Sequence, residues 1–476
     1  MGSETPTTTL PRKLEGYDFY REVLGSPKYI VAPMVDQSEL PFRRLCRRYG
    51  GQLVYTPMIH AKLFADNTKK YRNQFFNIPC GEEGDPSTDR PLIVQFCAND
   101  PEYLLTSAKV VEKHCDGVDI NLGCPQDIAR KGKYGAFLQD DWDLIFKLIN
   151  TLHKNLAVPV TAKFRVFPSI EKTVEYAQML ERAGAQILTC HGRAREQRGH
   201  NAGLASYEHI RAVKQNVSVP VFANGNILFQ EDIERCLRET GCDGVMSAEG
   251  ILYNPALFAG LAPSPTTSSP DDAALLARHP PHAALAQEYL DIVRTLRTPT
   301  SASAIKGHLF KILRPALLRH ADLRERLGRV KVDQQQQGKN KRAATGAATP
   351  FWDTGLEPYV EVVREMGARL AQDAERELAG EGEEGARKSV VELVRVQEGT
   401  GLKLLPWWLA QPYWRPLRKG ESPSWLAFRT LIDDILTQKR PKAADSPPAE
   451  GDAGDSEGPG KKAKVELAPV SIACAL

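Results

Sequence analysis

The sequence predicts an α/β protein, a (β/α)₈ TIM barrel followed by a helical domain and a disordered C-terminal tail. Eight short apolar runs alternate with helix-like stretches between about residues 28 and 260, and helix-like sequence without strands follows from residue 281. Nearly continuous apolarity is typical of parallel strands that are buried on both faces. A doubly wound open sheet shows the same alternation, but eight strand–helix units are many for such a sheet and match the size of a barrel.

The predicted strands are rich in Val, Ile, Leu and Phe. Amphipathic stretches such as 141–154 separate most of them, as helices on the outside of a barrel require. In chain order the strands are Tyr29–Met34, Leu53–Pro57, Leu92–Phe96, Gly117–Asn121, Val158–Arg165, Ala185–His191, Val219–Ala223 and Gly244–Ser247.

Changes in composition mark the boundaries of the domains. A stretch rich in Pro, Ser and Thr indicates a linker after the barrel, and four consecutive glutamines lie in a polar insertion that we expect to be disordered. A tryptophan-containing segment near the end either forms a small module or packs onto the rest. The predicted parts are a flexible N-terminus (1–25), the barrel (26–262), the linker (263–280), the helical domain (281–380) with its insertion (329–350), the small C-terminal module (388–436) and the tail (437–476).

Composition also limits the class of protein. The formal net charge is only +3, so attraction to nucleic acid must come from local patches. Nine scattered cysteines form no C-x-x-C pair, and we expect no metal site but reduced thiols in a cytosolic or nuclear monomer. No apolar run approaches the roughly 20 residues of a membrane span. Basic clusters at 439–442 and 461–464 either form a nuclear signal or only solvate the tail.

Unusual residues follow nearly every predicted strand. The active site of a parallel barrel lies at the carboxyl ends of its strands, where many loops contribute. The residues in question are Pro33 and Met34 at the end of the first strand, Gln95 in the third, Asn121 to Pro125 at the end of the fourth, Lys163 and Arg165 in the fifth, and His191 to Arg193 at the end of the sixth.

The last two strand ends indicate a phosphate site. Asn224-Gly225-Asn226 follows the seventh strand and Ala248-Glu249 follows the eighth, and these two loops commonly bind phosphate in such barrels. Glycine lets backbone N–H groups approach phosphate oxygens. The alternative is a pair of ordinary turns, since Asn-Gly is a common turn pair.

Three of these side chains are candidates for chemistry. Lys163 interrupts an apolar strand, so it either binds a negative group or forms a salt bridge with a barrel carboxylate. His191 is either functional or a core histidine bonded to a backbone carbonyl. Cys124, held between Gly123 and Pro125 at the mouth, is a nucleophile, an acid or a packing residue, with its position favouring chemistry.

The helical domain carries a cluster of cations that outnumbers Asp322 and Glu325 nearby in the sequence. Such a cluster forms a salt-sensitive track for phosphates or a merely solvated helix face. Its members are Lys306, Lys311, Arg314, Arg319, Arg324, Arg326, Arg329 and Lys331.

Taken in order, these strand-end motifs resemble those of the tRNA-dihydrouridine synthases. The resemblance covers about residues 28–260 and continues into the helical region near 305–327. The variant Gly-Cys-Pro-Gln at 123–126, followed by Gly-Lys-Tyr-Gly-Ala-Phe-Leu at 132–138, is similar to the eukaryotic type that acts on D-loop positions 16 and 17 of tRNA.

The resemblance implies a tRNA substrate, an FMN cofactor, and NADPH or NADH as reductant. It implies reduction of uracil at C6 and protonation of C5 by Cys124 as general acid, which requires a thiol whose pKa is not strongly lowered. The implied cofactor residues are Pro33, Met34, Val35, Gln95, Lys163, His191, Asn224, Gly225, Asn226, Ala248 and Glu249, and the implied tRNA-binding residues are Asn121, Arg193, Arg195, Lys306, Lys311 and Arg314.

Two positions depart from the pattern of the family. Many members have Asp where this chain has Asn226, and bacterial members often have Gly-Arg in place of Ala248-Glu249. A glutamate side chain repels phosphate, so we expect Glu249 to contribute its backbone N–H. An FMN-dependent dehydrogenase of small molecules, similar to dihydroorotate dehydrogenase, would also explain Lys163 but not the basic helices, and an inactive RNA-binding barrel is a third alternative.

Overall fold

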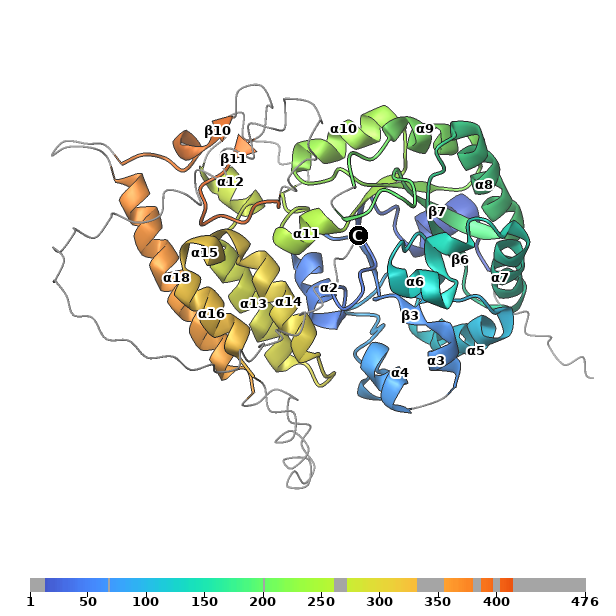
Figure 1. Cartoon of the computed structure of the whole chain (residues 1–476), viewed down its shortest axis with the longest axis horizontal. Coiled ribbons are helices and arrows are strands. Elements are labelled where there is room, and N and C mark those ends of the chain that lie inside the picture. The colour runs from blue at the N-terminus through green and yellow to red at the C-terminus, as the bar shows by residue number, and fades with distance from the viewer. Residues whose placement is uncertain are drawn as a thin grey trace, which may run out of the picture.

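The computed structural model describes residues 13–66, 69–199, 202–260, 272–331, 355–379, 387–396 and 403–413. Eight parallel strands close into a barrel, seen on the right in Figure 1, which confirms the predicted fold. Neighbouring strands pair in parallel, β9 pairs with β1, and a pairing of β2 with β4 completes the ring. A short extra strand, β3 (Ile59–His60), extends along the end of β4. The barrel strands are β1 (Tyr29–Val31), β2 (Leu53–Tyr55), β4 (Leu92–Cys97), β5 (Gly117–Leu122), β6 (Val160–Arg165), β7 (Ala185–His191), β8 (Val221–Asn224) and β9 (Gly244–Ser247).

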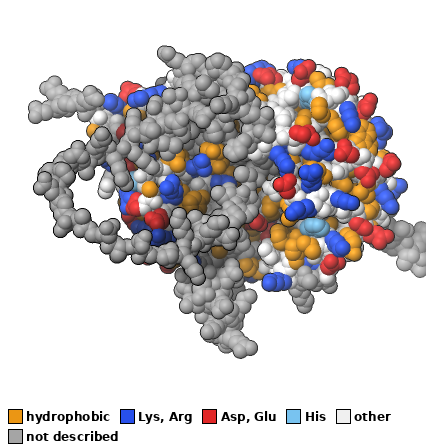
Figure 2. Space-filling view, viewed as in Figure 1, with side chains coloured by type: hydrophobic (Ala, Val, Ile, Leu, Met, Phe, Trp, Pro, Cys, Tyr) orange, Lys and Arg blue, Asp and Glu red, His pale blue; other side chains and the backbone are white. Residues whose placement is uncertain are grey.

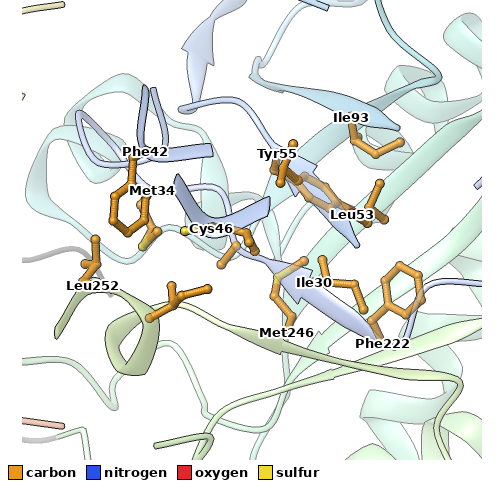
Figure 3. Packing of buried hydrophobic residues seen from close by; sticks show 14 of the residues in the cluster. Ile30, Met34, Phe42, Cys46, Leu53, Tyr55, Ile93, Phe222, Met246 and Leu252 are labelled. Atoms are coloured by element: carbon orange, nitrogen blue, oxygen red, sulfur yellow. The ribbon is translucent and has the colours of Figure 1, made fainter. Parts of the chain in front are cut away.

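Helices cover the outside of the barrel and begin where the sequence supplies a cap. The side chains of Asp100, Asp141, Ser169 and Ser206 each accept a hydrogen bond from an N–H of the first turn that follows. Apolar side chains of strands and helices form one continuous core, part of which is shown in Figure 3. The helices are α2 (Leu40–Arg48), α3 (Ala61–Ala65), α4 (Lys69–Phe75), α5 (Pro101–Val111), α6 (Asp127–Gly132), α7 (Trp142–Asn155), α8 (Ile170–Ala183), α9 (Tyr207–Asn216), α10 (Gln230–Thr240) and α11 (Glu249–Tyr253).

The N-terminal segment packs against the amino end of the barrel. It comprises α1 (Gly16–Asp18) and a π-helical turn (Phe19–Val23). Phe19 is fully buried beside Gly117, the first residue of β5, and the hydroxyl of Tyr20 donates to the carbonyl of Asp243 at 3.1 Å. The prediction of a flexible N-terminus is therefore wrong for residues 13–25, because these aromatic side chains close the amino end of the barrel.

A bundle of helices lies beside the barrel, on the left in Figure 1. Its first helix falls within the predicted linker, so the linker assignment is wrong from residue 272 onward. The predicted insertion lies outside the described residues from 332 to 350, and the predicted tail lies outside them entirely. The helices are α12 (Asp272–Arg278), α13 (His282–Thr295), α14 (Ala302–Ile312), α15 (Arg314–Arg319), α16 (Ala321–Arg329) and α18 (Glu357–Leu378).

A buried carboxylate joins the bundle to the barrel. Glu39, at the start of α2, accepts a hydrogen bond from the hydroxyl of Tyr289 at 2.8 Å and lies 3.0 Å from Nε2 of His308. The ring of His308 stacks on Phe42 with centroids 4.1 Å apart. Burial alone raises the pKa of Glu39, but His308 and Tyr289 bring it below its ordinary value. The bundle is thus fixed to the helix that follows the first strand.

The described parts of the segment 387–413 pack onto the rest of the chain. For these residues, the alternative of an independent small module is therefore wrong. It contains a short antiparallel pair, β10 (Arg395–Val396) and β11 (Lys403–Leu404). Leu409 is fully buried and forms a β-bridge with Pro281 at the start of α13. Within the described ranges no helix combines the length and apolarity needed to cross a bilayer.

Substitution of Phe19→Ala should lower the free energy of unfolding by about 3 kcal/mol, because it removes a fully buried ring from the end of the barrel. Urea denaturation measures this difference. Val23→Ala, at a position 41% exposed on the same turn, is the control and should cost less than about 0.5 kcal/mol. Equal effects of the two substitutions would show that the segment does not close the barrel.

Candidate active site

Strand register brings most of the predicted site residues together at the carboxyl end of the barrel. Asn121 pairs with Lys163 across β5 and β6, and His191 pairs with Asn224 across β7 and β8. Gln95 lies in β4 and is fully buried. Residues that are far apart in the sequence therefore line one opening, as the sequence predicts.

Two buried cations in this opening lack an acidic partner. Among the described residues, no carboxylate lies within 4 Å of the charged nitrogens of Lys163 or Arg165. Lys163 donates to the neutral side chain of Asn224 at 2.8 Å. The Nη2 atom of Arg165 is buried without a hydrogen-bond partner. The alternative of a salt bridge for Lys163 is wrong, and the opening holds donors that fit an anion.

Burial and mutual repulsion alter the acidity of this cationic group. Burial, with the charge of Arg165, lowers the pKa of Lys163 to about 8, and burial with Arg193 lowers that of Arg165 to about 10. The pKa of His191 falls well below its ordinary value, first through burial and then through the neighbouring cations. Nη1 of Arg193 lies 3.0 Å from Nε2 of His191. Since a guanidinium only donates, Nε2 accepts and the imidazole is neutral.

Cys124 lies directly after β5 on a turn with fixed N–H groups. The side-chain oxygen of Asn121 accepts hydrogen bonds from the N–H of Gly123 at 3.1 Å and of Cys124 at 2.9 Å. The cysteine is 8% exposed and packs with Cys97 and Tyr134. Burial raises the pKa of its thiol, although nearby cations oppose the effect. A thiol of this kind keeps its proton at neutral pH.

The three carbonyl groups of the same turn are also held. The sequence assigned no role to Arg165 and did not single out Arg198, yet both donate here from buried or half-buried positions. The acceptors are the carbonyl of Gly123 for Nε of Arg165 at 2.8 Å, that of Cys124 for the N–H of Ala136 at 3.0 Å, and that of Pro125 for Nη1 of Arg198 at 2.6 Å.

The glycine at position 135 permits this close return of the chain. Its φ is +66°, and a Cβ atom there would lie 2.7 Å from the carbonyl oxygen of Cys124. Any other residue would push the 3₁₀ turn at 135–138 away from the thiol.

The two predicted phosphate loops contact each other. The hydroxyl of Ser247 donates to the carbonyl of Ile227 at 3.1 Å, which ties the end of β9 to the loop after β8. The side chain of Asn226, at φ +60°, accepts from and donates to the backbone of Ala205, at 2.9 Å in each case. The side chain of Asn226 therefore braces the loop after β7. Gly225 packs against Ala205 of that loop as well.

The remaining predicted cofactor residues flank these loops. The N–H of Ala32 donates to the carbonyl of Ser247 at 3.0 Å, which places Pro33, Met34 and Val35 beside the end of β9. The side chain of Met34 is buried and lies near Phe42 and Leu252 (Figure 3). Ala248 and Glu249 stand at the start of α11. Contact of these residues with a cofactor stays a prediction.

The predicted tRNA-binding arginines lie on the loop after β7. Arg193 donates to Asn226 and to the carbonyl of Gly203. Arg195 pairs with Asp140 at 2.8 Å and lies over the ring of Phe137. Both therefore reach the rim of the opening, with intramolecular partners already in place.

Most of the basic cluster of the bundle is engaged within the chain. Lys306 donates to the carbonyls of Gly328 and Val330, and Lys311 donates to Gln37 at 2.8 Å. Arg314 lies over an aromatic ring of the C-terminal segment. Arg326 pairs with Glu365 of α18, an acid far away in the sequence. The expectation that only Asp322 and Glu325 oppose this cluster is wrong, because α18 supplies further carboxylates.

A different set of cations lies free beside Cys124. Arg130, Lys131 and Lys133, on and directly after α6, are exposed. They form no ion pair within 4 Å in the part of the chain that the structure describes. In Figure 2 Lys and Arg side chains gather over this part of the barrel face. These three residues are not among the predicted tRNA-binding residues, most of whose charge lies in the helical domain.

Comparison with known proteins agrees with this geometry. The model of the family "Dihydrouridine synthase (Dus)" matches residues 30–349. The chain belongs to the dihydrouridine synthase family. It is 46% identical to the tRNA-dihydrouridine(16/17) synthase [NAD(P)(+)] of Schizosaccharomyces pombe, over 85% of this chain and 92% of the relative. It is 44% identical to that of Saccharomyces cerevisiae, over 90% and 93%, and 45% identical to the corresponding "-like" protein of Rattus norvegicus, over 79% and 84%.

Alkylation of Cys124 by iodoacetamide should accelerate about tenfold per pH unit up to pH 9 without levelling off, because only the thiolate reacts and burial raises the pKa of the thiol. Mass spectrometry of the peptide that contains Cys124, after reaction at several pH values, measures the rate. A small free thiol, whose pKa is about 8.5, is the reference. A rate that levels off below pH 8 would show a stabilised thiolate and contradict an acid role.

Proposed function

We propose that this protein reduces uridine to 5,6-dihydrouridine in the D-loop of tRNA, at positions 16 and 17, with FMN as cofactor and NADPH or NADH as reductant. The relatives that carry this activity in their names match nearly the whole chain. The observation that carries the proposal is the pairing, at one barrel opening, of cations without acidic partners and a protonated thiol.

The residues present fit a flavin. The unpartnered Nη2 of Arg165 and the Nζ of Lys163 supply buried positive charge, which favours an electron-rich ring. The joined loops after β8 and β9 would hold the phosphate, through Asn224, Gly225, Asn226, Ala248 and Glu249. Gln95, His191 and the residues 33–35 would line the ring. When bound and reduced, the flavin supplies the electrons for the reaction.

Cys124 would protonate C5 of the uracil ring. The proton would leave the thiol as negative charge develops at that carbon, so a thiol that is neutral beforehand is required. The five hydrogen bonds around its turn hold the sulfur in one place, which is the kind of fixed geometry that favours reaction. Asn121 and Arg193 at the rim would hold a uracil that has been turned out of its stack.

The exposed cations of α6 would contact the tRNA backbone. Arg130, Lys131 and Lys133 are accessible, lack ion pairs within the described residues, and follow the Cys124 turn by only a few residues. Phosphate contacts so close to the opening would position the target nucleotide, whereas Lys306, Lys311 and Arg314 would contribute only by giving up partners inside the chain.

Dihydrouridine mapping tests the proposed function directly. Transfer RNA from cells that lack the protein should lose dihydrouridine at positions 16 and 17, and the purified protein with NADPH should restore it. The isolated protein should also be yellow and lose its colour on addition of NADPH. Turnover of dihydroorotate, with no effect on tRNA, would replace the proposal by the small-molecule alternative.

The substitution Cys124→Ala should leave flavin content unchanged and lower the rate of dihydrouridine formation by about a thousandfold, since the proton donor to C5 is lost. Flavin absorbance and a single-turnover assay with reduced enzyme and tRNA measure the two quantities. Cys97→Ala, a substitution of the neighbouring buried cysteine, is the control. Full activity of Cys124→Ala would eliminate the acid role.

Reversal of charge on α6, in the triple variant Arg130→Glu, Lys131→Glu and Lys133→Glu, should weaken tRNA binding about a hundredfold. The slope of log affinity against log salt should fall by about 2, since phosphate contacts are lost. The matched control reverses Lys28, Lys154 and Arg238, which are exposed at the amino end of the barrel. A control variant that binds as weakly as the α6 variant would indicate a general charge effect.

A further inference from the structure

A buried carboxylate inside the barrel has no role in the proposed chemistry. Asp119 of β5 is fully buried, and no cation lies within 4 Å of it among the described residues. One carboxylate oxygen accepts the hydroxyl of Thr161 at 2.6 Å, and the other accepts Nε2 of Gln95 at 2.8 Å. Burial raises the pKa of Asp119 to about 6. Burial of such a group is costly, so its position calls for an explanation.

Asp119 begins a chain of hydrogen bonds that ends at the catalytic turn. Gln95 donates to Asp119 through Nε2, and its Oε1 accepts from Nδ2 of Asn121 at 2.9 Å. The Oδ1 of Asn121 then accepts from the N–H groups of Gly123 and Cys124. Two side-chain amides thus link the carboxylate to the backbone of the turn.

The direction of both amides follows from the two ends of this chain. A carboxylate only accepts and a backbone N–H only donates. If the amide of Gln95 were reversed, its oxygen would face the carboxylate of Asp119. If the amide of Asn121 were reversed, its nitrogen would face two N–H donors. Each wrong orientation leaves a buried polar group unpaired, which costs about 1 to 3 kcal/mol.

We propose that Asp119 is a positioning residue: it orients the side chains of Gln95 and Asn121 and thereby holds the turn that carries Cys124. The inference rests on the proposed function only in treating Cys124 as the proton donor. Gln95 and Asn121 both retain hydrogen-bonding capacity, one N–H and one lone pair for Gln95 and one N–H for Asn121, so the chain of bonds is compatible with contacts to a flavin or a uracil.

The test compares three variants by hydrogen–deuterium exchange of the N–H groups of Gly123 and Cys124, measured on peptides that span 121–126. In Asp119→Leu an apolar side chain of similar size offers no acceptor to the amide of Gln95, which therefore loses the group that orients it. Exchange should become about tenfold faster. Thr161→Val, the matched control, leaves the bond between Gln95 and Asp119 intact and should change exchange by less than twofold.

A swap that places the carboxylate at position 95 and the amide at position 119 should restore the protection of the N–H groups of Gly123 and Cys124 from exchange. In the double variant Gln95→Glu with Asp119→Asn, the new amide donates to the new carboxylate. The outer bonds, from Thr161 to residue 119 and from Asn121 to residue 95, keep their direction. Exchange at Gly123 and Cys124 should return to within twofold of the wild type, although flavin binding is free to change because Gln95 is a proposed cofactor residue.

A second measurement separates positioning from general stability. In flavin-loaded Asp119→Leu, reduction by NADPH should keep its rate, while reoxidation by tRNA should slow about tenfold. Wild-type exchange in folded Asp119→Leu, or equally fast exchange in Thr161→Val, would overturn the inference. If Asp119→Leu does not fold, the swap decides: protection supports the inference, and rapid exchange or failure to fold overturns it. Exchange needs neither flavin nor tRNA, so failure of the proposed function would be seen separately.

Discussion

The site depends on the burial of two positive charges at one end of a barrel without a carboxylate beside them. Lys163 and Arg165 occupy alternate positions on β6, so both side chains point toward the same side of that strand. Their solvation comes from neutral oxygens: Arg165 donates to the carbonyls of Gly123, Ala194 and Gln197, and Lys163 donates to Asn224. Asp119 acts on Lys163 from beyond 4 Å and does not cancel this excess, since burial and Arg165 still lower the pKa of Lys163 to about 8. A direct ion pair would remove the excess, and with it the attraction for an electron-rich ligand.

The same carbonyl bonds shape the loops of the opening. Because Arg165 binds the backbone after β5 and the backbone after β7, it draws the Cys124 turn and the segment 194–197 toward one point. Asn226 braces the following segment by its bonds to Ala205. The sulfur, the rim arginines and the paired phosphate loops thus have positions that depend on one another. Burial keeps the imidazole of His191 and the thiol of Cys124 uncharged, and the cations around His191 disfavour its charged form further.

Much of this arrangement was accessible from the sequence, for a simple physical reason. Strands buried on both faces read as short apolar runs, so a lysine within β6 or a cysteine between glycine and proline is conspicuous. Interactions between residues that are far apart in the sequence leave no such local signal. Nothing near Arg326 indicates that Glu365 neutralises it, and nothing near Phe19 shows that it closes the barrel. Asp119 is as conspicuous within β5 as Lys163 is within β6, but its role is not, because its partner Gln95 lies on a different strand.

The chain crosses between barrel and bundle more than once, and this path has a mechanical consequence. After α18 it returns to the barrel, where Lys403 pairs with Glu231 and Leu405 packs on Phe229, and then to the bundle, where Leu409 bridges to Pro281. Together with the hydrogen bonds of Glu39, these contacts attach the bundle to the barrel at more than one place. With attachments both at Glu39 and along the segment 403–409, the bundle has no single joint about which it could swing relative to the barrel.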